Sequence, residues 1–169
     1  GIMPMHLIVG LGNPGEFYKF NRHNVGFIIA DAIVGRYELE HEKSKFKSDV
    51  YKGSIDGNKV ILIKPQTFMN NSGSAVAAFE RFYKIGVQNT IVIYDEIDLS
   101  FGKVKIKVAG GDAGHNGIKS INSHMENNYL KMRIGVGHPG KKEMVPGYVL
   151  SDFEQEEEVK IRKLSDNIA

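Results

Sequence analysis

Five short polar segments of this chain combine residue types that can bind a polar ligand and move a proton. They carry asparagine, histidine and carboxylate side chains and are Gly12-Asn13-Pro14-Gly15, Asn21-Arg22-His23-Asn24, Phe68-Met69-Asn70-Asn71, Tyr94-Asp95-Glu96 and Gly114-His115-Asn116-Gly117. An amide both donates and accepts hydrogen bonds, and an imidazole titrates near neutral pH. The mixture favours binding of a polar substrate together with proton transfer, and it does not suit a metal site.

Four of these segments follow stretches that we predict to be β-strands. The stretches are Leu7–Leu11, Val60–Lys64, Thr90–Tyr94 and Lys103–Val108. In an open α/β sheet, ligands bind in the crevice at the carboxyl ends of the strands. We therefore expect one edge of the sheet, completed by His23 from the first loop, to gather Asn13, Asn70, Asp95, His115 and Asn116.

The remaining pattern supplies the elements that would hold these residues. Helices are predicted at Val25–Tyr37, Ser72–Ile85 and Ile118–Met125, with a last helix opened by the capping box Ser151-Asp152-Phe153-Glu154. Strands at Ser48–Ile55 and Lys59–Lys64 flank the hairpin signal Asp56-Gly57, and another strand is predicted at Leu130–Val136. Strands that alternate with helices, plus one hairpin, predict an α/β fold with a twisted mixed β-sheet flanked by α-helices.

Length and composition fit one domain over residues 3–169, and Gly1-Ile2 before Met3 are interpreted as a cloning remnant. The chain has 169 residues, 41% of them hydrophobic, and no cysteine. No stretch approaches the ~20 apolar residues of a membrane span, and the N-terminus lacks a signal-peptide pattern. Without cysteine, disulfide and thiolate chemistry are excluded, and we expect a cytoplasmic location.

Charge is distributed unevenly although the net charge is only +2. Residues 103–142 hold eight basic and two acidic side chains, whereas residues 143–169 hold three basic and seven acidic ones. A local excess of this kind attracts a polyanion even when the whole protein is nearly neutral.

The segment from Gly10 to Gly15 matches the glycine pattern G-x-G-x-x-G of a dinucleotide site. Pro14 has no N–H to offer a phosphate, and the next helix is predicted only from Val25. The acidic residue expected about 20 residues further on, Asp31, falls inside that helix. A tight turn that presents Asn13 is the better interpretation, and no cofactor is expected.

His23 lies among polar neighbours in a loop, where it is either a solvated histidine or a general base. A general base needs a partner that fixes its tautomer. Asp95 is the best candidate because it follows a predicted buried strand, although Glu96 and Asp98 compete for this role.

A protein nucleophile or a metal is not indicated. Ser72 and Ser74 lack the G-x-S-x-G elbow, and Ser72 is better placed to cap a helix. The six histidines show no i, i+4 pair around an acid. The nucleophile is therefore expected to be water.

Lysines alternate with aliphatic residues along the strand expected at 103–108, which places Lys103, Lys105 and Lys107 on one side. Lys131 and Arg133 alternate in the same way on a later strand. If the two strands are neighbours, five cations share one surface. This surface is either a solubilising face or a contact for a phosphate backbone.

Taken together, the polar segments resemble the bacterial-type peptidyl-tRNA hydrolase family. The matching motifs, in chain order, are Gly10-Leu11-Gly12-Asn13-Pro14-Gly15 with Tyr18, Arg22-His23-Asn24 with Gly26, Lys64-Pro65-Gln66-Thr67-Phe68-Met69-Asn70, Asp95-Glu96-Ile97-Asp98, Gly114-His115-Asn116-Gly117, and Arg133-Ile134-Gly135-Val136-Gly137-His138-Pro139-Gly140. Each motif is short, but six in order across most of the chain are specific.

The resemblance implies a monomeric cytoplasmic esterase that cleaves peptide from tRNA without a metal or cofactor. By similarity, His23 is the general base, Asp95 orients it, and Asn13 distinguishes a blocked amino group from a free one. The positions that match contacts to the peptide or the tRNA are Tyr18, Phe68, Asn70 and Asn116, and Met69 and His115 lie next to them as further candidates. Lys105, Lys107 and Arg133 resemble the clamp for the tRNA end.

The sequence departs from the family pattern at a few positions, and two other functions remain open. Asn21 stands where Thr is common and Ala113 where Gly is common, the loop before Arg133 is short, and the last helix is brief. A non-catalytic tRNA-binding module would need only the basic face, not His23 and Asp95. A nucleotide-dependent enzyme rests on the glycine pattern alone.

Overall fold

Seven strands form one mixed sheet in the computed structural model, which describes residues 5–108, 111–112, 114–126, 128–157, 160–161 and 163. The strands are β1 (His6–Gly10), β2 (Glu40–Lys45), β3 (Ser48–Ile55), β4 (Asn58–Pro65), β5 (Thr90–Glu96), β6 (Val104–Val108) and β7 (Leu130–Gly135). Their order across the sheet is β2-β3-β4-β1-β5-β7-β6. The central strands β4, β1, β5 and β7 are parallel, whereas β2, β3 and β6 pair antiparallel with their neighbours.

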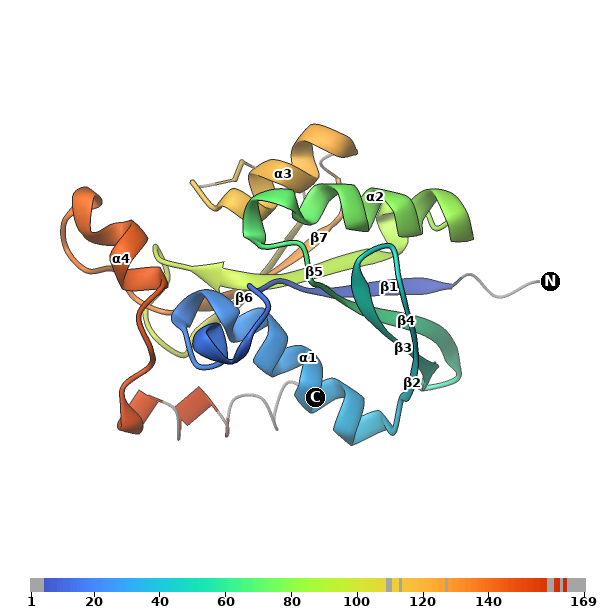
Figure 1. The fold of residues 1–169 in the computed structure, drawn as a ribbon, viewed down its shortest axis with the longest axis horizontal. Coiled ribbons are helices and arrows are strands. Elements are labelled where there is room, and N and C mark those ends of the chain that lie inside the picture. The colour runs from blue at the N-terminus through green and yellow to red at the C-terminus, as the bar shows by residue number, and fades with distance from the viewer. Residues whose placement is uncertain are drawn as a thin grey trace.

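Helices cover both faces of this sheet (Figure 1). One face carries α1 (Val25–Tyr37), and the other carries α2 (Ser72–Tyr83) and α3 (Asn116–His124). Apolar side chains that alternate along the buried strands fill two clusters, one against α2 and α3 and one against α1. The expected α/β class with a mixed sheet flanked by helices is confirmed.

The start of α1 lies unusually close to the centre of the sheet because two glycines face each other there. A Cβ atom added to Gly10 would lie 2.5 Å from the Gly26 carbonyl oxygen, and one added to Gly26 would lie 2.4 Å from the Ile93 oxygen. Only glycine permits such an approach. Gly10 of the first motif therefore serves helix packing, and the packing places the residues just before α1 directly above β5.

Most predicted elements occur where the sequence pattern places them. The bounds of α1 agree with the prediction, and the hairpin between β3 and β4 turns at Asp56 and Gly57 with φ of 51° and 82°. Both angles are positive, as a type I′ turn requires. Among the described residues, no helix is long and apolar enough to cross a membrane.

Three local predictions need correction. Neither β2, whose six residues are mostly exposed and charged, nor the short helix α4 (Val145–Val149) is predicted by the sequence pattern. The last helix does not begin at Ser151. Its first helical residue is Gln155, and the Glu157 carboxylate accepts from the Glu154 N–H, as the third residue of a capping box does. Residues 158–159, 162 and 164–169, including Arg162, lie outside the described residues.

The strand before His115 also runs in the unexpected direction. β6 is antiparallel to β7, so its C-terminal end lies at the amino edge of the parallel strands. His115 and Asn116 reach the site because the following segment returns to it and α3 starts there. The expected residues do meet at one edge of the sheet. For this segment, however, the prediction that they directly follow the carboxyl end of a parallel strand was wrong.

Candidate active site

His23 and Asp95 form a buried pair at the carboxyl edge of the sheet. His23 belongs to the 3-10 turn η2 (Arg22–Asn24) that leads into α1, and Asp95 is the penultimate residue of β5. The His23 Nδ1 atom lies 2.9 Å from Asp95 Oδ1 and 2.8 Å from Oδ2. The side chains are 8% and 2% exposed, so this contact is largely shielded from water.

This contact fixes the tautomer of His23. A carboxylate only accepts hydrogen bonds, so Nδ1 must carry the proton and Nε2 keeps the lone pair. Burial lowers the pKa of His23, but the charge of Asp95 and its hydrogen bond outweigh burial and raise the pKa above 6.5. Burial also opposes ionisation of Asp95, yet its interaction with His23 and the hydrogen bonds from His23 and His115 hold the pKa of its carboxyl below the usual range. His23 is therefore a strengthened base.

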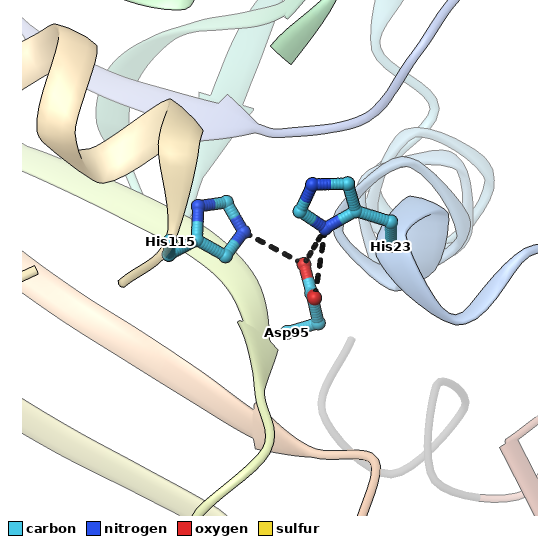
Figure 2. A group of neighbouring side chains, drawn as sticks. All are labelled: His23, Asp95 and His115. Atoms are coloured by element: carbon cyan, nitrogen blue, oxygen red, sulfur yellow. Dashed lines mark hydrogen bonds and ion pairs between the residues drawn. The ribbon is translucent and has the colours of Figure 1, made fainter. Parts of the chain in front are cut away.

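His115 is a second partner of the same carboxylate (Figure 2). Its Nε2 atom lies 2.8 Å from Asp95 Oδ1, while its Nδ1 atom accepts from the N–H groups of Gly117 and Ile118 and so caps α3. Because Nδ1 accepts, Nε2 must carry the proton. Burial outweighs the attraction of Asp95 and lowers the pKa of His115, which keeps this ring neutral. Both ring nitrogens are thus occupied, and the side chain is 6% exposed.

Asn13 is held in one orientation by the segment that follows β4. Its Oδ1 atom accepts from the Met69 N–H at 2.7 Å, and Met69 begins the short turn η3 (Met69–Asn71). Because the oxygen is occupied, the amide presents its NH₂ group as a donor. The main chain of Asn13 is bonded in turn to the side chain of Asn24, at 2.9 Å and 2.8 Å.

A groove runs past these residues as two adjoining cavities of about 320 and 300 Å³. His23, Asn116, Pro146 and Val149 line both cavities. The first cavity also contains Asp95 and His115, and the second also contains Asn13, Phe68, Met69 and Asn70. The structure thus brings eight of the predicted site residues to one groove.

One wall of the groove was not foreseen from the sequence. It is formed by α4, which supplies Pro146 and Val149, and by Leu150. Arg22 attaches this wall to the turn that carries His23. Its guanidinium stacks 4.2 Å from the ring centre of Tyr148. It also donates to Ser151 Oγ, the Asp152 carbonyl and the Glu157 carboxylate.

Phe68 stands at the rim of the groove in a strained conformation. Its φ of 61° and ψ of 155° lie in a region that is almost restricted to glycine. The side chain is 50% exposed and packs edge-to-face against Tyr18. Tyr18 is not among the residues that line the two cavities, but its ring contacts Phe68, which lines one of them.

The expected cationic surface is smaller than predicted. In β6 and β7, Lys105 lies opposite Arg133 and Lys107 opposite Lys131, so these residues do share a face. Lys131 is buried, with its Nζ atom 4.1 Å from the Tyr129 ring centre, because α3 covers this part of the sheet. Lys105 and Lys107 are exposed, and Arg133 is partly exposed and 3.7 Å from Glu96. Within the described residues, none of these cations lines the groove.

His23, Asp95 and His115 also bring three possible metal-ligating atoms within 4.8 Å of one another. The spacing argument missed this group because its members come from three distant segments. Here the nitrogens and the carboxylate oxygens contact each other directly at 2.8–2.9 Å. Zinc binds such atoms at about 2.0–2.2 Å, so an ion would have to replace these hydrogen bonds. Metal independence remains a prediction.

The fold and the groove define an α/β protein in which a buried carboxylate orients the imidazole of a histidine that lines the groove. The sequence profile of the peptidyl-tRNA hydrolase family matches residues 7–169. The chain belongs to the peptidyl-tRNA hydrolase family.

Individual relatives agree with this assignment. A peptidyl-tRNA hydrolase of Brucella ovis is 53% identical over 154 residues, which cover 88% of this chain and 62% of the relative. The chain thus spans less than two thirds of the length of such curated relatives.

Solved structures are also similar. A crystal structure of peptidyl-tRNA hydrolase from Acinetobacter baumannii has a TM-score of 0.92 at 38% identity and covers 98% of this chain and 86% of its own. A complex of peptidyl-tRNA hydrolase with N-propanol has the same TM-score at 39% identity and covers 96% of this chain and 83% of its own.

Proposed function

We propose that this protein hydrolyses the ester bond of peptidyl-tRNA, releasing the peptide and free tRNA, with a water molecule activated by His23. The observation that carries the proposal is the His23–Asp95 pair, in which Nδ1 is bonded to the carboxylate and Nε2 is left as the basic nitrogen of a residue that lines the groove. Family membership supports the substrate class. Release of peptide in this way would return tRNA from stalled translation.

In the proposed reaction, His23 Nε2 takes a proton from water as the water oxygen attacks the ester carbonyl. Asp95 stabilises the imidazolium that forms, because its carboxylate is already ionised and bonded to Nδ1. The proton then passes from Nε2 to the ribose oxygen as the ester bond breaks. His115 keeps the Asp95 carboxylate in place through the Nε2 bond, so we propose a positioning role for it instead of direct substrate contact.

Asn13 would supply selectivity through the donor that its fixed orientation presents. An N-blocked residue carries a carbonyl oxygen next to its α-nitrogen, and this oxygen can accept from the Asn13 NH₂ group. A free α-ammonium group has only donors and would be left facing another donor. Unpaired polar groups discriminate strongly between substrates. Asn70 and Asn116, both exposed in the groove, would bind the remaining polar atoms around the ester.

The order of the strands gives the substrate a direction. The cationic residues Lys105, Lys107 and Arg133 lie on β6 and β7, on one side of Asp95, and Asn13 and Phe68 lie after β1 and β4 on the other. The tRNA end would therefore lie over β7 and β6, and the peptide would extend toward Phe68. One chain supplies all these residues, so we propose a monomer that acts where tRNA is used, in the cytoplasm.

Hydrolysis of N-acetyl-aminoacyl-tRNA tests this function, with tRNA binding measured in parallel. The wild-type protein should release the acetylated amino acid, whereas His23→Ala should lose turnover by about 10²–10⁴-fold and still bind tRNA. Binding without hydrolysis by the wild type would instead show a tRNA-binding module. His23→Ala activity close to wild type would exclude His23 as the base.

A further inference from the structure

Asn24 joins the two functional segments of the site through the main chain of Asn13. The Asn13 N–H donates to Asn24 Oδ1 at 2.9 Å, and the Asn24 Nδ2 group donates back to the Asn13 carbonyl at 2.8 Å. Both bonds are buried, and the Asn24 side chain is 1% exposed. The Asn24 side-chain amide thus bonds both the main-chain N–H and the carbonyl of Asn13, as a residue of a paired β-strand would.

The loop that receives these bonds continues with two residues that do not themselves place Asn13. Pro14 has no N–H to donate, and Gly15 has a φ of 104°, which glycine adopts at little cost. Asn13 must nevertheless be placed accurately, because its side chain binds the Met69 N–H and presents its NH₂ group to the groove. The reciprocal pair with Asn24 supplies that placement.

The helix that Asn24 precedes makes this use of its side chain unusual. Asn24 is the N-cap residue of α1, a position where asparagine normally accepts a hydrogen bond from the first turn of its own helix. Within the described chain, its side chain makes no such capping bond and is directed to Asn13 instead. The Asn24 side chain therefore serves Asn13 and not the first turn of α1.

We propose that Asn24 is a positioning residue that sets the discrimination between blocked and free amino groups by holding the main chain of Asn13. This inference rests on the selectivity role proposed above for Asn13. His23 is the preceding residue of the same turn, so one 3-10 turn both aims the base and fixes the selectivity residue. The Asn24–Asn13 bonds would act on recognition of the substrate's amino end, whereas the Asp95–His23 contact would act on the base.

The experiment compares kcat/KM for N-acetyl-aminoacyl-tRNA and free aminoacyl-tRNA in Asn24→Ala, Asn13→Ala and the double variant. The ratio of the two values should fall in Asn24→Ala by about tenfold to a hundredfold, because a misplacement of about 1 Å has effects of this size. The double variant should lose no more than Asn13→Ala alone, since Asn24 acts through Asn13. Asn24→Asp, which keeps the acceptor and loses the donor, should show an intermediate loss.

Asn21→Ala is the matched control. Asn21 is also buried in this segment, but its amide bonds to Asp152 instead of Asn13. Its loss should lower the melting temperature and leave the substrate ratio unchanged. If Asn24→Ala lowers both rates equally, or if the double variant loses the sum of the two effects, Asn24 is only structural and the inference is wrong.

Two further outcomes are separable. An unchanged ratio in Asn24→Ala, with a changed ratio in Asn13→Ala, overturns the role of Asn24 and leaves that of Asn13 intact. An unchanged ratio in Asn13→Ala overturns both roles. Should Asn24→Ala fail to fold, the ratio measured for Asn24→Asp decides by the same criteria.

Discussion

Exchanging Asp95 for asparagine should invert the tautomer of His23. The new side chain offers one acceptor and one donor in place of two acceptors. The His115 Nε2–H must still be accepted, because the Nδ1 atom of this ring is held by the N–H groups of Gly117 and Ile118. The amide oxygen of the new residue therefore turns to His115, and its NH₂ group faces His23 Nδ1. His23 then carries its proton on Nε2 and presents no lone pair to water.

The structure also gives the size of the preference that keeps the amide in this orientation. Turning it over would place the NH₂ group against the buried His115 Nε2–H and leave a donor unpaired. Such a defect costs about 1–3 kcal/mol, which is a preference of about 5- to 150-fold. Loss of the orienting aspartate in serine proteases lowers kcat about 10⁴-fold through the wrong tautomer. We expect Asp95→Asn to lower kcat about 10²–10⁴-fold with little change in KM.

Relief of the constraint at His115 should restore part of this activity. In the double variant Asp95→Asn/His115→Ser, a hydroxyl can still cap α3, and the amide of residue 95 is free to turn its oxygen to His23. Hydrolysis of N-acetyl-aminoacyl-tRNA by the double variant should exceed that of Asp95→Asn by about fivefold or more. The reasoning is refuted if Asp95→Asn keeps kcat near wild type, or if the double variant is no faster than Asp95→Asn.

Three further predictions concern the pH dependence of hydrolysis, the removal of metal ions and the cations of β6 and β7. First, kcat/KM should fall as the pH drops through a value above 6.5, because His23 must be neutral to act and Asp95 raises its pKa. In Asp95→Asn this midpoint should move to lower pH, and an unmoved midpoint would assign it to another group. Second, dialysis against EDTA should leave hydrolysis unchanged, and a loss that Zn²⁺ restores would contradict the metal-free mechanism. Third, neutralising Lys107 and Arg133 should raise KM for peptidyl-tRNA and reduce the log–log salt slope by about 0.7–0.9 per lost contact. A blocked amino acid esterified to a short 3′ fragment should be cleaved as before, and an equal loss on both substrates would place these cations in the catalytic centre or the fold.

The sequence predicted the parts of the fold that a strong local pattern determines. The bounds of α1 and the turn at Asp56-Gly57 follow from apolar spacing and from residues that accept a positive φ. β2 was missed because its exposed, charged residues lack alternation. α4 was missed because its five residues include Pro146 and Gly147, which usually end helices. Apolar spacing in the sequence thus identifies buried elements better than the edge strand β2 or the short helix α4 beside the groove.

The same limit applies to the site. Residue types and strand ends were enough to bring His23 to Asp95, because a base needs an orienting acid and a buried strand supplies one. The second bond of Asp95, to His115, depends on a segment that returns after an antiparallel strand, which no spacing rule predicts. Lys131 shows the opposite error, since period-two alternation places it with the other cations but says nothing of the helix above it.

The strained backbone of Phe68, with its positive φ, has a consequence for the engineering of this protein. A residue with a Cβ atom in this region raises the energy of the native state by about 1–3 kcal/mol, and glycine would remove most of this strain. A search for heat-resistant variants of this chain should therefore favour Phe68→Gly. The same change removes the aromatic ring that stands beside Asn13 and Met69, so the more durable protein should hold its substrate less well. Thermal resistance and substrate retention are therefore expected to oppose each other at this one residue.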